Sequence, residues 1–346
     1  MPTIKNKKII GIIPDMHLKE SLGYADYVSD RRITEKKEIL DFIVKSFADC
    51  DTIVFLGDQL NGRNNKSEVI KEFVEFIEKL RGKKLYFISG NHEKTGDGKS
   101  AIDFIGEIKN PDWHIITNKV EQIGSSTFSP YFSKPELEAK DDAEGSKKLM
   151  EQLNGGDMLF IHHAISDSLT GSGMTTNLFN EIVLPKKELE KRYKLIVAGH
   201  VHCPSTEGKT IIAGSVFNNE VGETQKYIWK IEENTLKVEQ IKLPGRAIVK
   251  LENPLVADFD KIDKSSIVKI IITDKKFKKD IDDIKKAAKK FDAYLLLEQI
   301  PKERKKMHYG DGESILEFPI DKLLELYAQE RKVDIAKLKN AYELIR

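Results

Sequence analysis

Apolar and polar residues alternate along the first part of the chain in a pattern that predicts strands separated by helices. Three short apolar runs have the length of buried strands, at Ile9–Ile13, Thr52–Leu56 and Lys84–Ser89. Between them, apolar residues recur at helical spacing from Ile33 to Phe47 and from Glu68 to Leu80. This alternation predicts right-handed crossovers and a largely parallel sheet that is covered by helices.

The pattern changes after Asn110, where short strand-like runs follow one another with few helices between them. One further helix is predicted, at Ser146–Leu153. The runs therefore predict a second sheet of mixed direction. They are His114–Ile116, Met158–Ile161, Leu195–Ala198, Thr210–Ala213, Tyr227–Ile231 and Leu236–Ile241.

The last hundred or so residues form a different pattern, which begins after a segment rich in proline and glycine. A strand at Ile267–Thr273, a helix at Phe277–Lys290 and a strand at Tyr294–Leu297 predict a small α+β unit. Two amphipathic helices follow, at Ile320–Glu330 and Ile335–Ile345. We therefore divide the chain into a core at 1–245, an α+β cap at 246–318 and C-terminal helices at 319–346.

Charge and composition narrow the class of protein only slightly. The 57 Lys and Arg residues nearly balance the 56 Asp and Glu residues, so a polyanionic partner would have to bind a local basic patch. Cys50 and Cys203 are too few for a disulfide framework. The N-terminus has no apolar run long enough for a signal peptide or a membrane span. We therefore expect a cytoplasmic protein without a membrane anchor.

Immediately after five of the apolar runs, the chain carries residues of the types that bind metals. In parallel sheets the carboxyl ends of the strands meet at one edge, so these loops should converge there. Carboxylates and imidazoles together suit borderline divalent cations such as Mn²⁺, Fe²⁺ or Zn²⁺. The residues are Asp15 and His17, Asp58, Asn91 and His92, His162 and His163, and His200 and His202.

The spacing of these residues suits two metals that share a ligand. In Asp15-Met16-His17 and His200-Val201-His202 the intervening residue points away, so both outer side chains face the same side. Two metals about 3.5–4 Å apart need a bridging carboxylate, and Asp58 is in the position for it. Either His162 or His163 could be the ligand, with His162 preferred.

The ordered motifs resemble those of the calcineurin-like metallophosphoesterase superfamily. Its D-x-H, G-D, G-N-H, H and G-H-x-H motifs are matched over roughly residues 7–245. The resemblance implies a four-layer α/β/β/α sandwich, here followed by the small α+β cap. The matching residues are Asp15, His17, Asp58, Asn91, His92, His162, His200 and His202.

The same resemblance implies a role for each matched residue. One metal would be held by Asp15, His17, Asp58 and His202, and a second by Asp58, Asn91, His162 and His200. Manganese is the usual ion of the family. His92 matches the residue that protonates the leaving oxygen, so it is the expected catalytic residue.

Within the superfamily the chain looks most like the nuclease subunit of SbcCD-type repair complexes. An Ala213-Gly214-Ser215 element follows G-H-x-H, a small cap follows the core, and paired amphipathic helices end the chain. The resemblance implies DNA exonuclease or endonuclease activity in repair or recombination. It also implies an SMC-like coiled-coil ATPase partner, and a homodimer is possible.

Other functions remain compatible with the same residues. The alternative is a small-molecule or cyclic-nucleotide phosphodiesterase, or a phosphatase, which would have no use for the C-terminal helices. A scaffold with a relict site is disfavoured by the complete ligand set. The lysines between Lys275 and Lys290 could contact a DNA backbone or form a solvated helix face, and Arg31 and Arg32 are further candidates for phosphate contacts.

Overall fold

The structure is a computed structural model of the chain, which divides into the compact units Met1–Glu298 and Gln299–Arg346. In the first unit it describes residues 8–20, 29–95, 98–168, 176, 181–218, 225–246, 248–264, 266–291 and 293–298. In the second unit it describes only 324, 325, 327, 328, 334–336, 338 and 339. The predicted C-terminal helices therefore lie mostly outside the described residues, although eight of these nine residues are helical.

The first sheet has six strands in the order β14-β13-β1-β2-β3-β4. Strands β1 to β4 run parallel, as the alternating pattern predicts for β1 to β3, while β13 and β14 are antiparallel additions at one edge. The strands are β1 Ile9–Ile13, β2 Thr52–Phe55, β3 Lys84–Ile88, β4 Trp113–Ile116, β13 Tyr227–Glu232 and β14 Lys237–Lys242.

The second sheet also has six strands, in the order β11-β12-β10-β7-β6-β5. Its four central strands are parallel and its two edge strands are antiparallel, so it is mixed as predicted. Its membership differs from the prediction, because local apolar patterns do not determine which sheet a strand joins: the runs at His114–Ile116, Tyr227–Ile231 and Leu236–Ile241 form β4, β13 and β14 of the first sheet. The strands are β5 Glu121–Ile123, β6 Ser126–Ser129, β7 Gly156–Ile161, β10 Tyr193–Ala198, β11 Ser205–Glu207 and β12 Thr210–Ile212.

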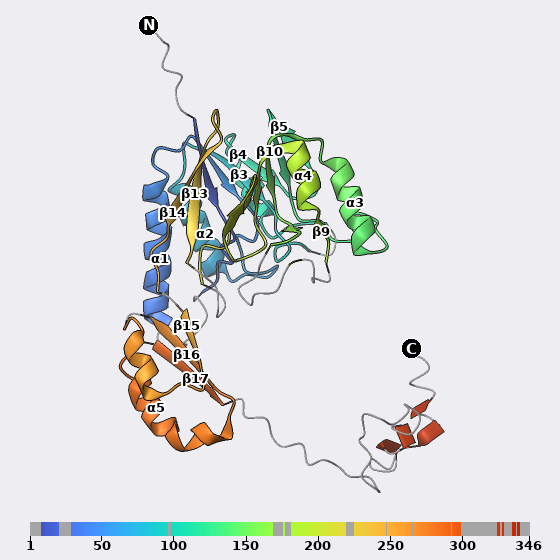
Figure 1. The fold of residues 1–346 in the computed structure, drawn as a ribbon. Coiled ribbons are helices and arrows are strands. Elements are labelled where there is room, and N and C mark those ends of the chain that lie inside the picture. Colours follow the sequence, from blue (N-terminus) through green and yellow to red (C-terminus); the bar gives the residue numbers. More distant parts are fainter. Residues whose placement is uncertain are drawn as a thin grey trace. The chain divides into compact units, whose positions relative to one another are not determined.

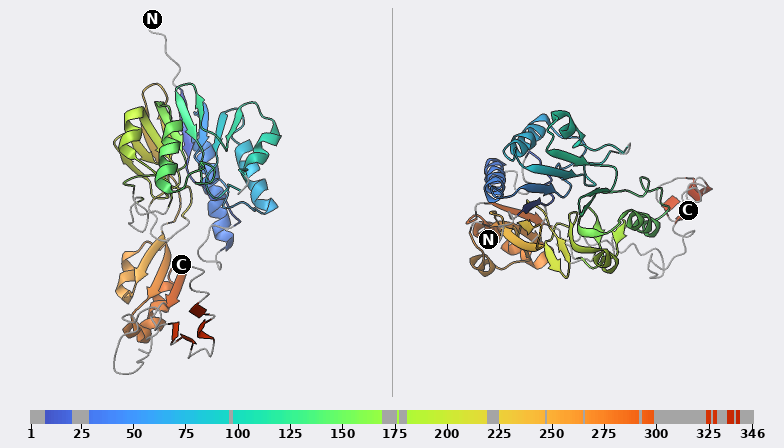
Figure 2. Two further views of the ribbon diagram at one scale, coloured as in Figure 1. Left: turned by 90° about the vertical axis from the view of Figure 1, so that its right-hand side faces the viewer. Right: turned by 90° about the horizontal axis from the view of Figure 1, so that it is seen from above.

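The two sheets pack face to face between helices, which confirms the four-layer sandwich (Figures 1 and 2). Ile12, Val54 and Phe160 belong to the apolar layer between the sheets. A second layer joins the first sheet to α1 (Ser29–Ser46) and α2 (Ser67–Glu78), and a third joins the second sheet to α3 (Asp142–Gln152) and α4 (Lys186–Arg192). All three layers bury apolar side chains from water, which is the main stabilising contribution to the fold.

The helices differ from the sequence prediction mainly at their ends. Helix α3 begins four residues earlier than predicted because the side chain of Asp141 caps it, accepting a hydrogen bond of 2.8 Å from the backbone N–H of Glu144. Helix α4 was not predicted, since its highly charged sequence contains only one buried residue, Leu189. A local capping residue therefore sets the start of α3, whereas α4 depends on the packing of Leu189.

The cap region forms a separate sheet of three parallel strands. A crossover made of the 3₁₀ segment η5 (Lys275–Asp280) and helix α5 (Ile281–Ala288) replaces the single helix that the pattern predicted. The strands are β15 Ile248–Glu252, β16 Ile267–Ile272 and β17 Ala293–Glu298, of which β15 was not predicted. The domain boundaries at 245/246 and 318/319 stay predictions.

Four short elements complete the described part of the chain. The strands β8 (Ala164–Ile165) and β9 (Val183–Leu184) pair with each other, and the 3₁₀ segments are η2 (Asp103–Ile108) and η4 (Val256–Lys261). Among the described residues, no helix is both long and apolar enough to cross a membrane.

Candidate metal centre

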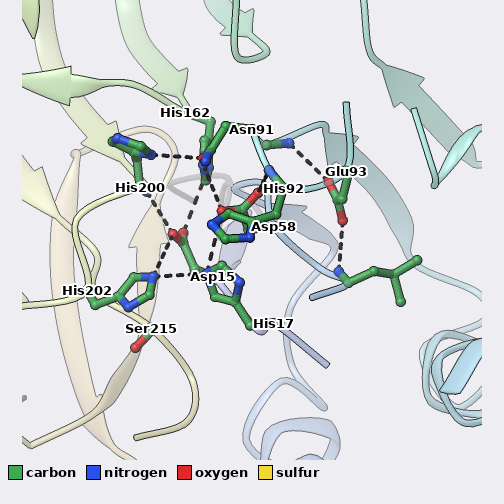
Figure 3. Close-up of polar contacts among 12 residues, drawn as sticks. Asp15, His17, Asp58, Asn91, His92, Glu93, His162, His200, His202 and Ser215 are labelled. Carbon is green, nitrogen blue, oxygen red and sulfur yellow. Dashed lines mark hydrogen bonds and ion pairs between the residues drawn. The ribbon is translucent and has the colours of Figure 1, made fainter. Parts of the chain in front are cut away.

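The side chains of the predicted site residues converge on one place (Figure 3). These residues follow the carboxyl ends of β1, β2 and β3 in the first sheet and of β7 and β10 in the second, so both sheets contribute. The structure thus brings together all eight predicted residues. They are Asp15, His17, Asp58, Asn91, His92, His162, His200 and His202.

Asp58 lies in the middle of this group. Its Oδ2 atom is 3.5 Å from Nε2 of His17 and 3.4 Å from Nε2 of His162. Its Oδ1 atom accepts a hydrogen bond of 2.9 Å from the backbone N–H of His92. One carboxylate therefore faces histidines from both sheets, which is the placement that a bridging ligand requires.

On one side of Asp58 the side chains of Asp15, His17 and His202 gather. The Nε2 atoms of the two histidines are 2.9 Å apart, and Oδ2 of Asp15 is 3.7 Å from Nε2 of His202. Oδ2 of Asp15 also accepts a hydrogen bond of 2.9 Å from the backbone N–H of His200. The Oδ1 atom of Asp15 is buried and has no hydrogen-bond partner among the residues that the structure describes.

On the opposite side the amide oxygen of Asn91 lies between two histidines. Its Oδ1 atom is 3.1 Å from Nε2 of His162 and 3.0 Å from Nδ1 of His200. The two imidazole rings pack edge to face with centroids 5.3 Å apart. The donor atoms therefore form two clusters that share Asp58.

The hydrogen bonds of His162 and His163 distinguish their roles. Nδ1 of His162 is 2.6 Å from the carbonyl oxygen of Leu56 and must donate to it, which directs Nε2 at the centre. Nε2 of His163 instead accepts from the backbone N–H of Phe132 at 2.9 Å, and its ring stacks on Tyr131. His162 is thus the histidine of this pair that faces the centre, and His163 supports the loop behind it.

Three residues of the centre have backbone conformations that are unfavourable for side chains with a Cβ. His17, Asp58 and His200 have φ angles of 45°, 49° and 79°, in the left-handed region. Conformations of this kind persist only where the surrounding structure enforces them, and they cluster at functional sites. Here the tight turns direct each side chain from the end of its strand to the shared centre.

The electrostatics of the buried carboxylates favour positive charge at the centre. Burial raises the pKa of Asp15 and opposes ionisation of Asp58, but the imidazoles of His162 and His17 outweigh burial at Asp58 and lower its pKa. Burial lowers the pKa of His17 to about 3, so this ring is neutral and keeps a free lone pair. Burial also opposes protonation of His162, yet Asp58 and Asp15 raise its pKa to about 10.

These observations fit divalent cations. Among the described residues, three sets of donor atoms lie within 4.8 Å of one another and could each contribute to holding an ion. They include the unpartnered oxygen of Asp15, which a cation would satisfy. The sets are Asp15, His17 and His202; His17, Asp58 and His92; and Asp15, Asp58 and His162.

Glycines in three of the loops allow the strands to approach the donor atoms closely. A Cβ at Gly57 would lie 2.1 Å from Nδ1 of His162, and one at Gly199 would lie 2.6 Å from Oδ1 of Asp15. A Cβ at Gly90 would lie 2.0 Å from Oδ1 of Asp58. The glycines of the G-D, G-N-H and G-H-x-H motifs are therefore needed because larger residues would displace the donor atoms.

Substitution of Gly90 with alanine should damage both the fold and the centre. We expect Gly90→Ala to lower the free energy of unfolding by about 1–3 kcal/mol, because the new methyl group overlaps the Asp58 carboxylate. Urea unfolding and calorimetric titration with Mn²⁺ would measure the two effects. Gly62→Ala is the matched control, since a Cβ there meets nothing within 4 Å, and equal behaviour of the two variants would contradict the explanation.

Two carboxylates close to the centre were not predicted from the sequence. Glu93 is fully buried and accepts hydrogen bonds from the backbone N–H groups of Gly90, at 3.0 Å, and Leu60, at 2.9 Å. Burial, with a contribution from Asp58, raises its pKa to about 8. Its position directly after Asn91-His92 was a signal that could have been used. Glu181 contacts His200, and no sequence signal connects these two residues.

The chain is similar to one protein family and to proteins of known structure. The family model described as calcineurin-like phosphoesterase matches residues 9–204. An archaeal phosphodiesterase of known structure is 14% identical, with 68% of this chain and 99% of that chain covered and a TM-score of 0.35. A metallophosphoesterase from Sphaerobacter thermophilus is 13% identical, with 73% and 91% covered and a TM-score of 0.35. No curated protein matches the chain.

Proposed function

The chain belongs to the calcineurin-like phosphoesterase family, and we propose that it is a two-metal phosphodiesterase that hydrolyses DNA. The family uses divalent metal ions, and this chain carries candidate residues for holding them. The observation that carries the proposal is the pair of donor clusters that share Asp58. Manganese is the ion we propose for both clusters.

The two clusters supply a ligand set for each ion. One ion would be held by Asp58 together with Asp15, His17 and His202, because the facing nitrogen and oxygen atoms of these three residues lie on one side of Asp58. Asp58, Asn91, His162 and His200 would hold the second, because the amide oxygen of Asn91 lies between the two histidines. Backbone N–H groups of His92 and His200 each donate to one oxygen of Asp58 and Asp15, respectively, and so hold the other oxygen of each carboxylate in place.

The reaction we propose is in-line attack of water on the phosphodiester. A pair of divalent ions supplies Lewis-acid stabilisation of the phosphoryl oxygens and lowers the pKa of water. The side chain of His92 is exposed at the rim of the centre, next to the ring of His17 at a centroid distance of 4.7 Å. From this position its imidazole can deliver a proton to the departing sugar oxygen.

Basic residues of the cap support a polyanionic substrate. Eight lysines are exposed between residues 275 and 290, six of them in η5 and helix α5 and two directly after α5. Of these, Lys276, Lys286 and Lys290 are paired with aspartates. Arg32 does not belong to such a surface, because it is buried and hydrogen-bonded to Glu35 at 2.7 Å. The side chain of Arg31 lies outside the described residues. The lysines give DNA phosphates a basic face to contact.

The proposal is tested by incubating the protein with Mn²⁺ and linear double-stranded or single-stranded DNA, with bis-p-nitrophenyl phosphate in parallel. We expect both kinds of substrate to be hydrolysed and both activities to stop when the metal is chelated. Hydrolysis of the small ester with intact DNA would contradict the nuclease proposal and favour a small-molecule or cyclic-nucleotide phosphodiesterase. Absence of both activities would contradict the metal centre itself.

A coiled-coil ATPase is the partner we propose for the C-terminal unit. Support comes from the amphipathic spacing of residues 320–330 and 335–345 and from the separate compact unit that Gln299–Arg346 forms. Deleting 320–346 should abolish co-purification with such an ATPase but leave hydrolysis of bis-p-nitrophenyl phosphate unchanged. If the shortened chain still binds the ATPase, the docking proposal is wrong.

A further inference from the structure

His200 is held between two oxygen-bearing side chains, one on each side of its ring (Figure 3 shows the inner contact). Its Nδ1 atom is 3.0 Å from the amide oxygen of Asn91. Its Nε2 atom is 2.9 and 3.0 Å from the two carboxylate oxygens of Glu181. Since a carboxylate can only accept, Nε2 must carry a proton, and in the neutral ring Nδ1 then presents its lone pair to the centre.

The fold brings Glu181 to this position through the small two-stranded sheet. Strand β8 begins directly after His163, and it pairs with β9, which begins two residues after Glu181. The pairing of Ala164 with Val183 therefore anchors Glu181 next to the loops of the centre. Nothing in the local sequence requires this contact, because 18 residues separate Glu181 from His200.

We propose that Glu181 is a positioning residue, which orients His200 and strengthens it as a metal ligand. This inference rests on the proposed function, because it takes Nδ1 of His200 as a ligand atom. A carboxylate behind a ligating histidine fixes the tautomer and the ring orientation and makes the ligating nitrogen more basic. His162 is oriented by a backbone carbonyl, that of Leu56, so its ring does not depend on a side chain in this way.

The contact between Glu181 and His200 is not one that the fold requires. The side chain of Glu181 is 22% exposed, so water can solvate its carboxylate when His200 does not. Removal of Glu181 should therefore leave the metal-free protein folded. The expected loss is confined to the cluster of Asn91, His162 and His200, whereas the cluster of Asp15, His17 and His202 keeps its contacts.

The experiment titrates metal-free protein with Co²⁺ and follows both the heat of binding and the visible absorption of the bound ion. Wild-type protein should bind two ions. In Glu181→Ala we expect one of the two binding steps to weaken by about 10–100-fold, with the other unchanged. The affinity of Glu181→Gln for this ion should lie between those of wild-type protein and Glu181→Ala, because the glutamine amide oxygen still accepts from Nε2 of His200 but carries no charge. Glu151→Ala is the matched control, since its side chain is exposed on α3.

The outcomes separate this inference from the proposed function. If wild-type protein binds fewer than two ions, the two-metal proposal fails and the inference fails with it. If wild-type protein binds two ions and Glu181→Ala binds both equally well, only the positioning role is wrong. Equal melting temperatures of the metal-free variants would show that any weakened binding is not a consequence of unfolding.

Discussion

Replacing Asp58 with asparagine should remove nearly all activity, with a loss of kcat of about a thousandfold or more. Asp58 is the only carboxylate whose oxygen lies close to both His17 and His162, at 3.5 and 3.4 Å, among the described residues. The neutral amide of asparagine cannot supply the charge that two cations share. Both metal-binding steps should therefore weaken together, unlike the effect expected at Glu181.

The metal-free Asp58→Asn protein should remain folded. Asparagine keeps an Oδ1 atom that can accept from the backbone N–H of His92. Its neutrality also relieves repulsion, because Asp58 adds to the effect of burial in raising the pKa of both Asp15 and Glu93. Mn²⁺ at 100 times its Kd should stabilise wild-type protein by about 2.7 kcal/mol for each site, but not the variant.

Hydrolysis rates, titration calorimetry and thermal unfolding with and without Mn²⁺ would measure these effects. Asp112→Asn is a matched control, because Asp112 is exposed on the loop before β4. Retention of activity and of two bound ions by Asp58→Asn would show that the centre is not organised around Asp58.

Replacing His92 with glutamine should lower kcat for DNA by about 10²–10⁴-fold and leave metal affinity unchanged. Glutamine has no proton to deliver at the pH of the reaction, but its backbone N–H can still donate to Asp58. The loss should be much smaller for bis-p-nitrophenyl phosphate, whose acidic phenol departs without a proton. This dependence on the leaving group identifies a general acid more clearly than the loss of activity alone.

The main competing role for His92 is that of a ligand, since it also lies in a donor set with His17 and Asp58. Titration of His92→Gln with Mn²⁺ separates the two roles. Weaker metal binding, with equal losses on both substrates, would contradict the general-acid role. His114→Gln is the control, because the side chain of His114 is 47% exposed and pairs with Glu121 on strands β4 and β5, whose ends do not carry residues of the metal centre.

Local sequence was sufficient to predict most of the parallel strands and most of the centre. Short apolar runs such as Ile9–Ile13 bury both faces of a strand, and this requirement shows in the sequence without knowledge of the fold. Ligands follow these strands because the carboxyl ends of parallel strands meet at one edge. Asp15, Asp58 and His200 were therefore predictable from their places after the strands.

Tertiary structure decided the features that depend on contacts between distant segments. His162 and His163 are adjacent residues of the same type, so the sequence does not distinguish them. Only their hydrogen bonds, to the carbonyl of Leu56 and from the N–H of Phe132, show which ring faces the centre. Helix α4 has a sequence with little apolar periodicity, so its packing through Leu189 determines that it forms.

The contact between Glu181 and His200 shows the limit of sequence reasoning most clearly. The contact depends on the pairing of β8 with β9. Both strands have only two residues, so they are too short to be recognised from a pattern in the sequence. The sequence by itself thus determined the apolar strands that precede the centre and the ligands that follow them, since both are local requirements of burial and chemistry. Only the tertiary structure decided how the rings are oriented and supported, since a hydrogen bond between distant residues depends on their positions in space.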